Sequence, residues 1–227
     1  MADGFEQLLR SGSHLPKFLP VFDFVCRELT CWPGRPDFLG IEGRIPNASN
    51  GHTPLSPLAC IALSLLKPQA RRTEKYIQTR ISSDERTTRA VLRALEKRGY
   101  VIASGQRTYR LGPASEFIRL EITAFELKLS NPRRAVYQAI RNKEFSDRSY
   151  VVVPPKNARG YAPFSPAIDR WGIGLLTYDL ETGRIKTISK SRTLQPPDRA
   201  QAIRSRSRIA SEAVSEETTG LLCGSTY

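Results

Sequence analysis

The chain has 227 residues, and its 35 Lys and Arg against 22 Asp and Glu leave a formal net charge of +13. No apolar run reaches the roughly 20 residues of a membrane-spanning helix, and Asp3 and Glu6 stand where a secretory signal would be basic and then apolar. Composition therefore argues against a membrane protein and predicts a cytoplasmic chain. It favours a polyanionic partner, of which nucleic acid is the best candidate.

The first segment predicts a helix that runs into a strand. In "LPVFDFVCRELTCW", apolar residues including Val21, Val25 and Leu29 recur at helical spacing, and Glu28 lies near the helix end. The stretch "GRPDFLGI" then predicts a short strand with Asp37 at its start. The next stretch, "GRIPNASNGHTPLSP", is rich in Pro, Asn, Gly and Ser, so it predicts a linker.

The middle of the chain predicts three helices and a hairpin. The helix "SPLACIALSLL" ends at Pro68, and "RRTEKYIQTRI" is a shorter one. The third, "SSDERTTRAVLRALEKRGY", opens with a capping box formed by Ser82 and Glu85 and ends at Gly99. The hairpin "YVIASGQRTYRLG" turns at Ser104-Gly105. Three helices and a hairpin resemble a winged helix-turn-helix, and "LEKRGYVIASGQRTYRL" is similar to the end of its recognition helix and its wing.

The third of these helices carries a basic stripe opposite an apolar one. Val91, Leu92 and Leu95 form the apolar side. A helix in the major groove needs cations for phosphates and Arg or Thr donors for base edges. An ordinary solvated helix face is the alternative. The resemblance implies contacts to double-stranded DNA from Arg86, Thr87, Arg89, Arg93 and Lys97, with Arg107 in the wing.

The second half predicts a central strand followed by a helix and further strands. In "SEFIRLEITAFELKLS" both faces carry apolar residues, yet Glu126 and Lys128 point to the same side. A helix over "NPRRAVYQAIRNKEF" has Pro132 in its first turn, and "RSYVVVPP" is a buried strand. The stretch "WGIGLLTYDLETGRIKTISK" predicts a hairpin that turns at Thr182-Gly183. From about Ser191 the chain predicts a mobile tail or one helix.

Without residues 50–112, the order is helix, strand with Pro36-Asp37, strand with Glu126-Leu127-Lys128, helix, strand. That order resembles the core of the PD-(D/E)XK nuclease superfamily. The resemblance implies an α/β fold, a restriction-endonuclease-like mixed sheet flanked by helices, with an inserted winged helix-turn-helix. The implied parts are a nuclease-like domain built from residues 1–49 and 113–190, an insertion at 50–112, and a basic tail at 191–227.

The resemblance also implies a reaction. Asp37 and Glu126 would hold Mg2+ or Mn2+, while Lys128 would orient the attacking water or stabilise charge on the phosphate. Glu28 would be a further acid from the first helix, and Gln138, with Arg134 on the same helix, would approach the metal or the phosphates. E-x-K and P-D also occur by chance, as exposed ion pairs and turns. Should Asp37 and Glu126 lie apart, Glu121 would be the alternative first acid.

Three functions compete. The first is a metal-dependent DNA nuclease that uses its winged helix to position the duplex. The second is a DNA-binding transcriptional regulator whose nuclease-like domain no longer cuts, but the presence of both acids and the lysine favours catalysis. The third, RNA processing, fits less well because the helix and wing suit duplex DNA. Cutting both strands often takes two active sites, so a homodimer stays open.

Overall fold

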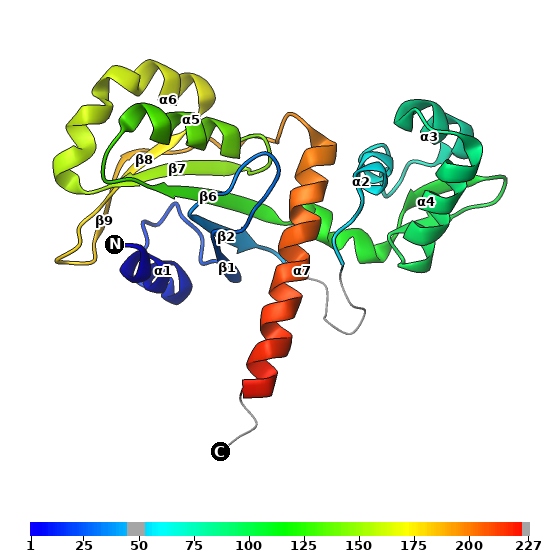
Figure 1. The fold of residues 1–227 in the computed structure, drawn as a ribbon, viewed down its shortest axis with the longest axis horizontal. Coiled ribbons are helices and arrows are strands. Elements are labelled where there is room, and N and C mark those ends of the chain that lie inside the picture. Colours follow the sequence, from blue (N-terminus) through cyan, green and yellow to red (C-terminus); the bar gives the residue numbers. More distant parts are fainter. Residues whose placement is uncertain (45–52, 224–227) are drawn as a thin grey trace. The chain divides into compact units, whose positions relative to one another are not determined.

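The computed structural model describes residues 1–44 and 53–223, with side chains described up to residue 215. The chain divides into two compact units (Figure 1). Unit 1 comprises Met1–Gly43 and Glu121–Asp198, and unit 2 comprises Arg44–Leu120 and Arg199–Tyr227. Unit 2 is therefore wider than the predicted insertion and takes in the C-terminal segment. Most of the predicted linker lies outside the described residues.

Unit 1 is built on a six-stranded mixed sheet in the order β1-β2-β6-β7-β8-β9. β1 pairs antiparallel with β2, and β2 pairs antiparallel with β6. β6, β7 and β8 run parallel to one another, and β9 pairs antiparallel with β8. The predicted mixed α/β architecture is confirmed at this level. The strands are β1 (Phe24–Arg27), β2 (Phe38–Glu42), β6 (Glu121–Leu127), β7 (Arg148–Val153), β8 (Gly174–Tyr178) and β9 (Ile185–Ser189).

Helices cover both faces of this sheet. Helix α1 (Ala2–Ser11) lies on one face, and α5 (Pro132–Asn142) and α6 (Ser165–Trp171) lie on the other (Figure 1). A 3-10 segment, η3 (Pro155–Phe164), leads from β7 into α6. Two parallel strands need a crossover, and α5 supplies it between β6 and β7.

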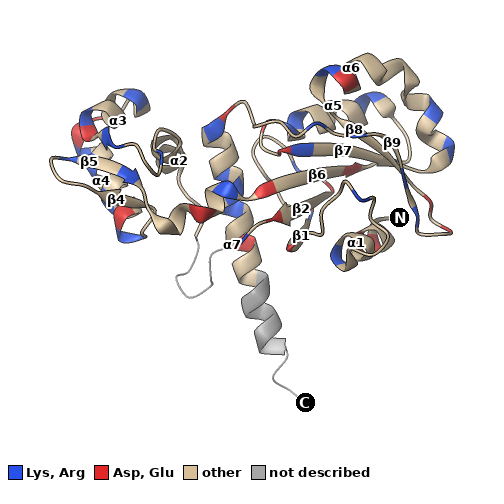
Figure 2. Cartoon of the chain, turned by 180° about the vertical axis from the view of Figure 1, so that it is seen from behind, with Lys and Arg blue, Asp and Glu red and all other residues tan. Residues whose placement is uncertain are grey.

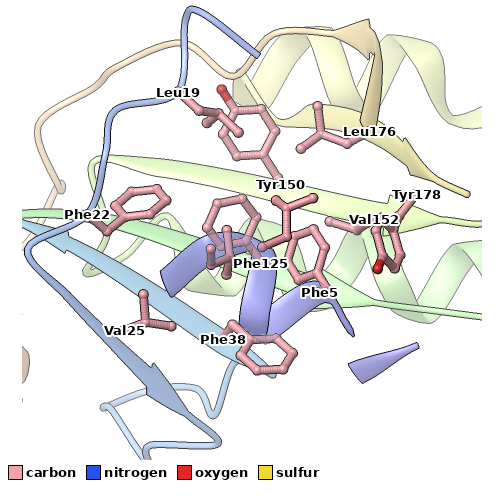
Figure 3. Packing of buried hydrophobic residues seen from close by; sticks show 12 residues of the cluster. Phe5, Leu19, Phe22, Val25, Phe38, Phe125, Tyr150, Val152, Leu176 and Tyr178 are labelled. Carbon is pink, nitrogen blue, oxygen red and sulfur yellow. The ribbon is translucent and has the colours of Figure 1, made fainter. Parts of the chain in front are cut away.

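Strand β7 is buried on both faces, and this explains why its sequence does not alternate between apolar and polar residues. Tyr150 and Val152 pack on the α1 side, while Val151 and Val153 pack against α5 and α6. Figure 3 shows the α1-side core, where the rings of Phe125 and Tyr150 stack and Phe5 meets Phe125 edge-on. Each buried side chain of this size contributes about 1.5–3 kcal/mol, so the central strands hold unit 1 together.

The helix predicted to begin the stretch Leu19–Trp32 and to run into a strand does not form. Phe24–Arg27 forms β1, which pairs antiparallel with β2, and Val21 is 70% exposed. The apolar spacing there fits a helix as well as it fits the loop and strand, and backbone pairing with a distant strand decided between them. The N-terminal helix of this unit is α1 instead. No helix was predicted there from the sequence, although α1 buries Phe5, Leu8 and Leu9.

Unit 2 consists of helices and a small three-stranded sheet in the order β3-β5-β4. For the C-terminal segment, where a mobile tail or one helix was predicted, the helix forms and packs against α2 and η2. The elements are α2 (Pro57–Ser64), β3 (Arg72–Thr73), α3 (Glu74–Ile81), α4 (Glu85–Lys97), β4 (Val101–Ala103), β5 (Thr108–Leu111), η2 (Pro113–Arg119) and α7 (Arg199–Cys223).

Capping residues close in the sequence mark both ends of helix α4, but the N-terminal cap is not the predicted residue. Its cap is Asp84, whose carboxylate accepts from the backbone N–H of Thr87 at 2.8 Å. The predicted cap, Ser82, ends α3 instead, in a left-handed conformation with φ 51°. Gly99 follows α4 with φ 71°, as expected of a helix stop that only glycine adopts without strain.

Helix α7 belongs to the core of unit 2. Ala202, Ile203, Ile209 and Ala213 are buried, and the buried guanidinium of Arg206 donates from Nε to the carbonyl of Leu120 at 2.8 Å. Apolar burial together with a satisfied buried cation is typical of an integral helix. No helix in the part of the chain that the structure describes is long and apolar enough to cross a membrane.

Candidate active site

The start of β2 and the end of β6 lie side by side in the sheet. Phe38 pairs with Phe125 across the two strands, and both rings belong to the α1-side core. Side chains alternate along a strand, so the neighbouring Asp37 and Glu126 project to the opposite face, which α5 covers. Sheet pairing therefore brings together two carboxylates that are far apart in the sequence.

Lys128 completes the cluster. Its Nζ lies 3.2 Å from Asp37 Oδ2 and 3.1 Å from Glu126 Oε2, so one ammonium group bridges the two acids. Asp37 Oδ2 also accepts from the backbone N–H of Leu127 at 2.7 Å, which fixes that carboxylate against β6. The structure thus brings the three residues of the predicted acid–acid–lysine set together.

Glu126 is the buried member of this set, with a side chain only 1% exposed. Its Oε1 accepts from Asn142 Nδ2 at 2.9 Å, whereas Oε2 faces Lys128 without hydrogen-bond geometry. Burial raises the pKa of Glu126, the Asn142 hydrogen bond opposes that rise, and the charge of Asp37 adds to it. The ionised form is costly here, so a second nearby cation would stabilise it.

The donor set fits a hard divalent cation with few protein ligands. Asp37 and Glu126 supply carboxylate oxygens, the type that Mg2+ takes, and Glu126 Oε2 is a buried oxygen without a hydrogen bond. Within residues 1–44 and 53–223, no group of three or more His, Cys, Asp or Glu side chains is placed to hold a metal ion. A metal here would take its remaining ligands from water and substrate.

Asn142 is a residue of this site that the sequence analysis missed. It ends α5 and is buried beneath the loop that joins β1 to β2. A Cβ added at Gly34 in that loop would lie 2.8 Å from Asn142 Oδ1, so only glycine allows the approach. Asn142 therefore contacts both Glu126 and the loop that leads into Asp37. A polar residue on the otherwise apolar inner side of α5 was the available signal.

Glu28 does not join the acidic pair through its side chain. It follows β1 with φ 50°, and its carboxylate accepts from Arg35 Nη2 at 2.7 Å. Its backbone N–H donates to the carbonyl of Asp37 at 3.0 Å. The prediction that Glu28 is a further acid supplied by a helix is therefore wrong. Glu28 and Arg35 instead close the base of the β1–β2 loop.

The two polar residues predicted on α5 lie in different surroundings. Gln138 sits one turn before Asn142, and its Oε1 is buried without a hydrogen-bond partner among the described residues. Arg134 is exposed, and its backbone N–H is capped by Asn131. The orphaned oxygen of Gln138 could accept from a water or ligand, whereas Arg134 faces solvent.

Glu121, the alternative first acid, lies at the other end of the same strand. Figure 2 shows acidic positions toward both ends of β6. Glu121 pairs across the sheet with Glu42, and Arg148 bridges them with N···O distances of 2.9 and 2.6 Å. It is therefore remote from Asp37, and the pairing of Asp37 with Glu126 makes it unnecessary.

In unit 2, the predicted DNA-contacting residues divide into two groups. Arg89 is held by Glu74 at 2.9 Å and by Glu85, and the hydrogen bond that Arg89 donates to Glu74 raises the pKa of Arg89. The hydroxyl of Thr87 donates to Asp84, and Arg107 lies 3.6 Å from Glu85. None of the ion pairs among described residues involves the remaining three, which are exposed: Arg86, Arg93 and Lys97.

Comparisons of the chain with models of known protein families, with curated proteins and with solved structures found no match in any of the three.

Proposed function

We propose that the protein is a metal-dependent DNA nuclease. The observation that carries the proposal is the convergence of Asp37, Glu126 and Lys128 where β2 begins and β6 ends. Two carboxylates and a lysine on one face of neighbouring strands are the groups that phosphodiester hydrolysis requires. Their placement also agrees with the predicted resemblance to the PD-(D/E)XK superfamily.

Each of the three residues has a distinct role. Asp37 and Glu126 bind the metal, and Asn142 keeps the buried carboxylate of Glu126 in place through its 2.9 Å hydrogen bond. A bound Mg2+ or Mn2+ would neutralise phosphate charge and lower the pKa of a water. Lys128, whose Nζ lies beside both acids, would donate to the attacking water or to a phosphate oxygen.

Unit 2 supplies duplex binding in this proposal. Its order of three helices and a hairpin, with a short strand between α2 and α3, supports the winged helix-turn-helix prediction. Arg86, Arg93 and Lys97 lie along the exposed side of α4 and are available for phosphates and base edges. The net charge of +13 adds attraction for DNA that depends on salt concentration.

Incubation of the protein with supercoiled plasmid and linear DNA tests the proposal. Cleavage is expected with Mg2+ or Mn2+ and not with EDTA. Asp37→Asn should abolish cleavage while leaving duplex affinity unchanged or higher, because a carboxylate near phosphate is neutralised. Lys128→Ala should also abolish cleavage but spare metal binding, measured by calorimetry. Cleavage in EDTA, or full activity of Asp37→Asn, would contradict the site. Duplex binding without cleavage under any metal would favour the regulator instead.

A further inference from the structure

A stripe of aromatic and basic side chains runs along α5, the helix that also carries Asn142 of the candidate site. Arg134, Tyr137 and Arg141 follow one another at spacings of three and four residues, so they share one side of the helix. Tyr137 is 60% exposed, and the guanidinium of Arg141 lies 6.0 Å from the centre of its ring. An aromatic ring between two arginines is therefore presented to solvent.

The β1–β2 loop brings a second aromatic ring to this stripe. Arg141 Nη2 donates to the carbonyl of Pro33 at 2.5 Å, which ties the loop to α5. The preceding residue, Trp32, is 57% exposed. Arg141 therefore links the two aromatic residues, since it contacts the ring of Tyr137 and the carbonyl of the residue that follows Trp32. Large exposed rings of this kind often mark a surface that has a partner.

The same two elements hold the acids. Asn142, the residue after Arg141, donates to Glu126, and its Oδ1 packs against Gly34, the residue after Pro33. The loop then leads through Arg35 and Pro36 into Asp37. The aromatic residues and the acidic pair therefore share one support.

The positive charge of α5 favours a polyanionic partner. The helix "PRRAVYQAIRN" contains three arginines and no acidic residue, and Figure 2 shows basic positions on it. An apolar protein partner would not require this charge, whereas a phosphate backbone does. Exposed rings interleaved with cations suit nucleotides whose bases are unpaired, because bases in a duplex present no free face.

We propose that Trp32 and Tyr137 form a stacking surface for unpaired DNA bases next to the scissile phosphate. The substrate class is then DNA with a single-stranded stretch, a gap or a frayed end at the cut. This inference rests on the proposed nuclease function for its position in the reaction. Base stacking itself takes place without metal and without cleavage.

Tryptophan fluorescence in EDTA tests the proposal, since Trp32 and Trp171 are the two tryptophans of the chain. Trp171→Phe leaves only Trp32 as a reporter. Trp32→Phe leaves only Trp171, which ends α6 just before β8 begins, and β8 lies two strands away from β6 in the sheet. Oligothymidylate should quench Trp32 and leave Trp171 unchanged. A blunt duplex or an abasic oligomer of equal length should quench Trp32 much less.

Affinity for labelled oligothymidylate, measured by anisotropy, gives the second readout. Tyr137→Ala should weaken binding about 5- to 100-fold, the range for losing one stacked base, and Tyr137→Phe should restore it. Equal quenching by the abasic oligomer, an unquenched Trp32, or wild-type affinity of Tyr137→Ala would each overturn the proposal. Tighter binding of oligouridylate than of oligothymidylate would overturn the choice of DNA.

The outcome separates this inference from the nuclease proposal. Quenching of Trp32 in a protein that cuts no DNA with Mg2+ or Mn2+ would leave the stacking surface standing without the nuclease. Plasmid cleavage without quenching would leave the nuclease standing and remove the stacking surface.

Discussion

The two ends of the β2–β6 strand pair carry the same charges in different settings. At one end Asp37 and Glu126 face Lys128, and at the other Glu42 and Glu121 face Arg148. Arg148 reaches both acids with separate nitrogens of one planar group, whereas Lys128 shares a single nitrogen between its two acids. The arrangement around Arg148 is a satisfied ion-pair network, whereas the one around Lys128 leaves the buried Oε2 of Glu126 without a hydrogen bond.

Burial sharpens this difference. Glu121 is half exposed, so water supports its charge, whereas Glu126 depends on Asn142 and Lys128 alone. Two acids and a base are therefore insufficient to identify a catalytic site. What distinguishes the Asp37 end is incomplete satisfaction in a buried place, which a metal or substrate can complete. The Glu121 end supplies a matched control for experiments on the other.

Replacing one acid at each end with glutamine should give the largest difference in cleavage rate. Glu126→Gln removes a carboxylate of the proposed metal site and should lower plasmid cleavage by at least about 10²–10³-fold, the scale for losing one key electrostatic group. Glu121→Gln should leave cleavage within about threefold, because that acid serves only Arg148 in the proposal. Initial rates at saturating Mg2+ provide the measurement. Similar losses in both variants would remove the distinction between the two ends.

Asn142 should have the next largest effect, because it positions Glu126 without touching substrate. Asn142→Ala should lower cleavage about 10- to 100-fold and raise the Mg2+ concentration needed for half-maximal rate. Asn142→Asp should be worse, since it places a like charge beside a buried carboxylate. Glu144→Gln, at an exposed position just after α5, is the control and should change the Mg2+ dependence little. An unchanged Mg2+ dependence in Asn142→Ala would show that Glu126 needs no such support.

Paired and unpaired charges can also be compared within unit 2. Replacing Arg86, Arg93 and Lys97 together with Ala should weaken duplex binding at least about tenfold and flatten its salt dependence, by about 0.9 in log–log slope per lost phosphate contact. Arg89→Ala should instead lower the melting temperature, because it leaves the buried Glu74 unpaired. Anisotropy at several salt concentrations and thermal melts check this. A larger loss of affinity from Arg89→Ala than from the triple variant would reverse the assignment.

The smallest expected effect is on stability and has opposite signs at the two ends. The pKa of Glu126 is raised above its ordinary value of 4.5, so the folded chain holds that proton more tightly than the unfolded chain. Its contribution to stability is therefore greatest below that value and falls as the pH rises through the folded pKa. In EDTA, Glu126→Gln should be more stable than wild type at pH 7.5, within about 0.5–2 kcal/mol, and lose this advantage near pH 4.

Glu121→Gln should show no such gain, because it removes a partner of Arg148 that water already screens, with a loss below about 1 kcal/mol. Urea unfolding followed by tryptophan emission measures both variants. The two tryptophans lie in unit 1, so the signal reports the unit that holds both clusters. A gain of the same size in both variants would mean that burial at position 126 has no special cost.

Much of the secondary structure could be predicted from local pattern. The helix at Pro132, the buried strand around Val151 and the hairpin at Thr182-Gly183 all form where the sequence placed them. Proline at a first helical turn and glycine at a turn act over a few residues, so they can be recognised without the fold. The misplaced cap at Ser82 shows the limit of such signals, because Asp84 two residues later offers an equally good side chain.

The sequence alone supplied the residue types of the candidate site, since P-D and E-x-K identify acids and a lysine suited to a metal and a phosphate. It could not supply their proximity, the part played by Asn142, or the difference between Glu126 and Glu121. Those follow from the pairing of β2 with β6 and from the packing of α5, which join residues that are distant along the chain. Side-chain identity fixes what a group can do, while burial and unmet hydrogen bonds, set only by tertiary contacts, fix whether it is left free to do it.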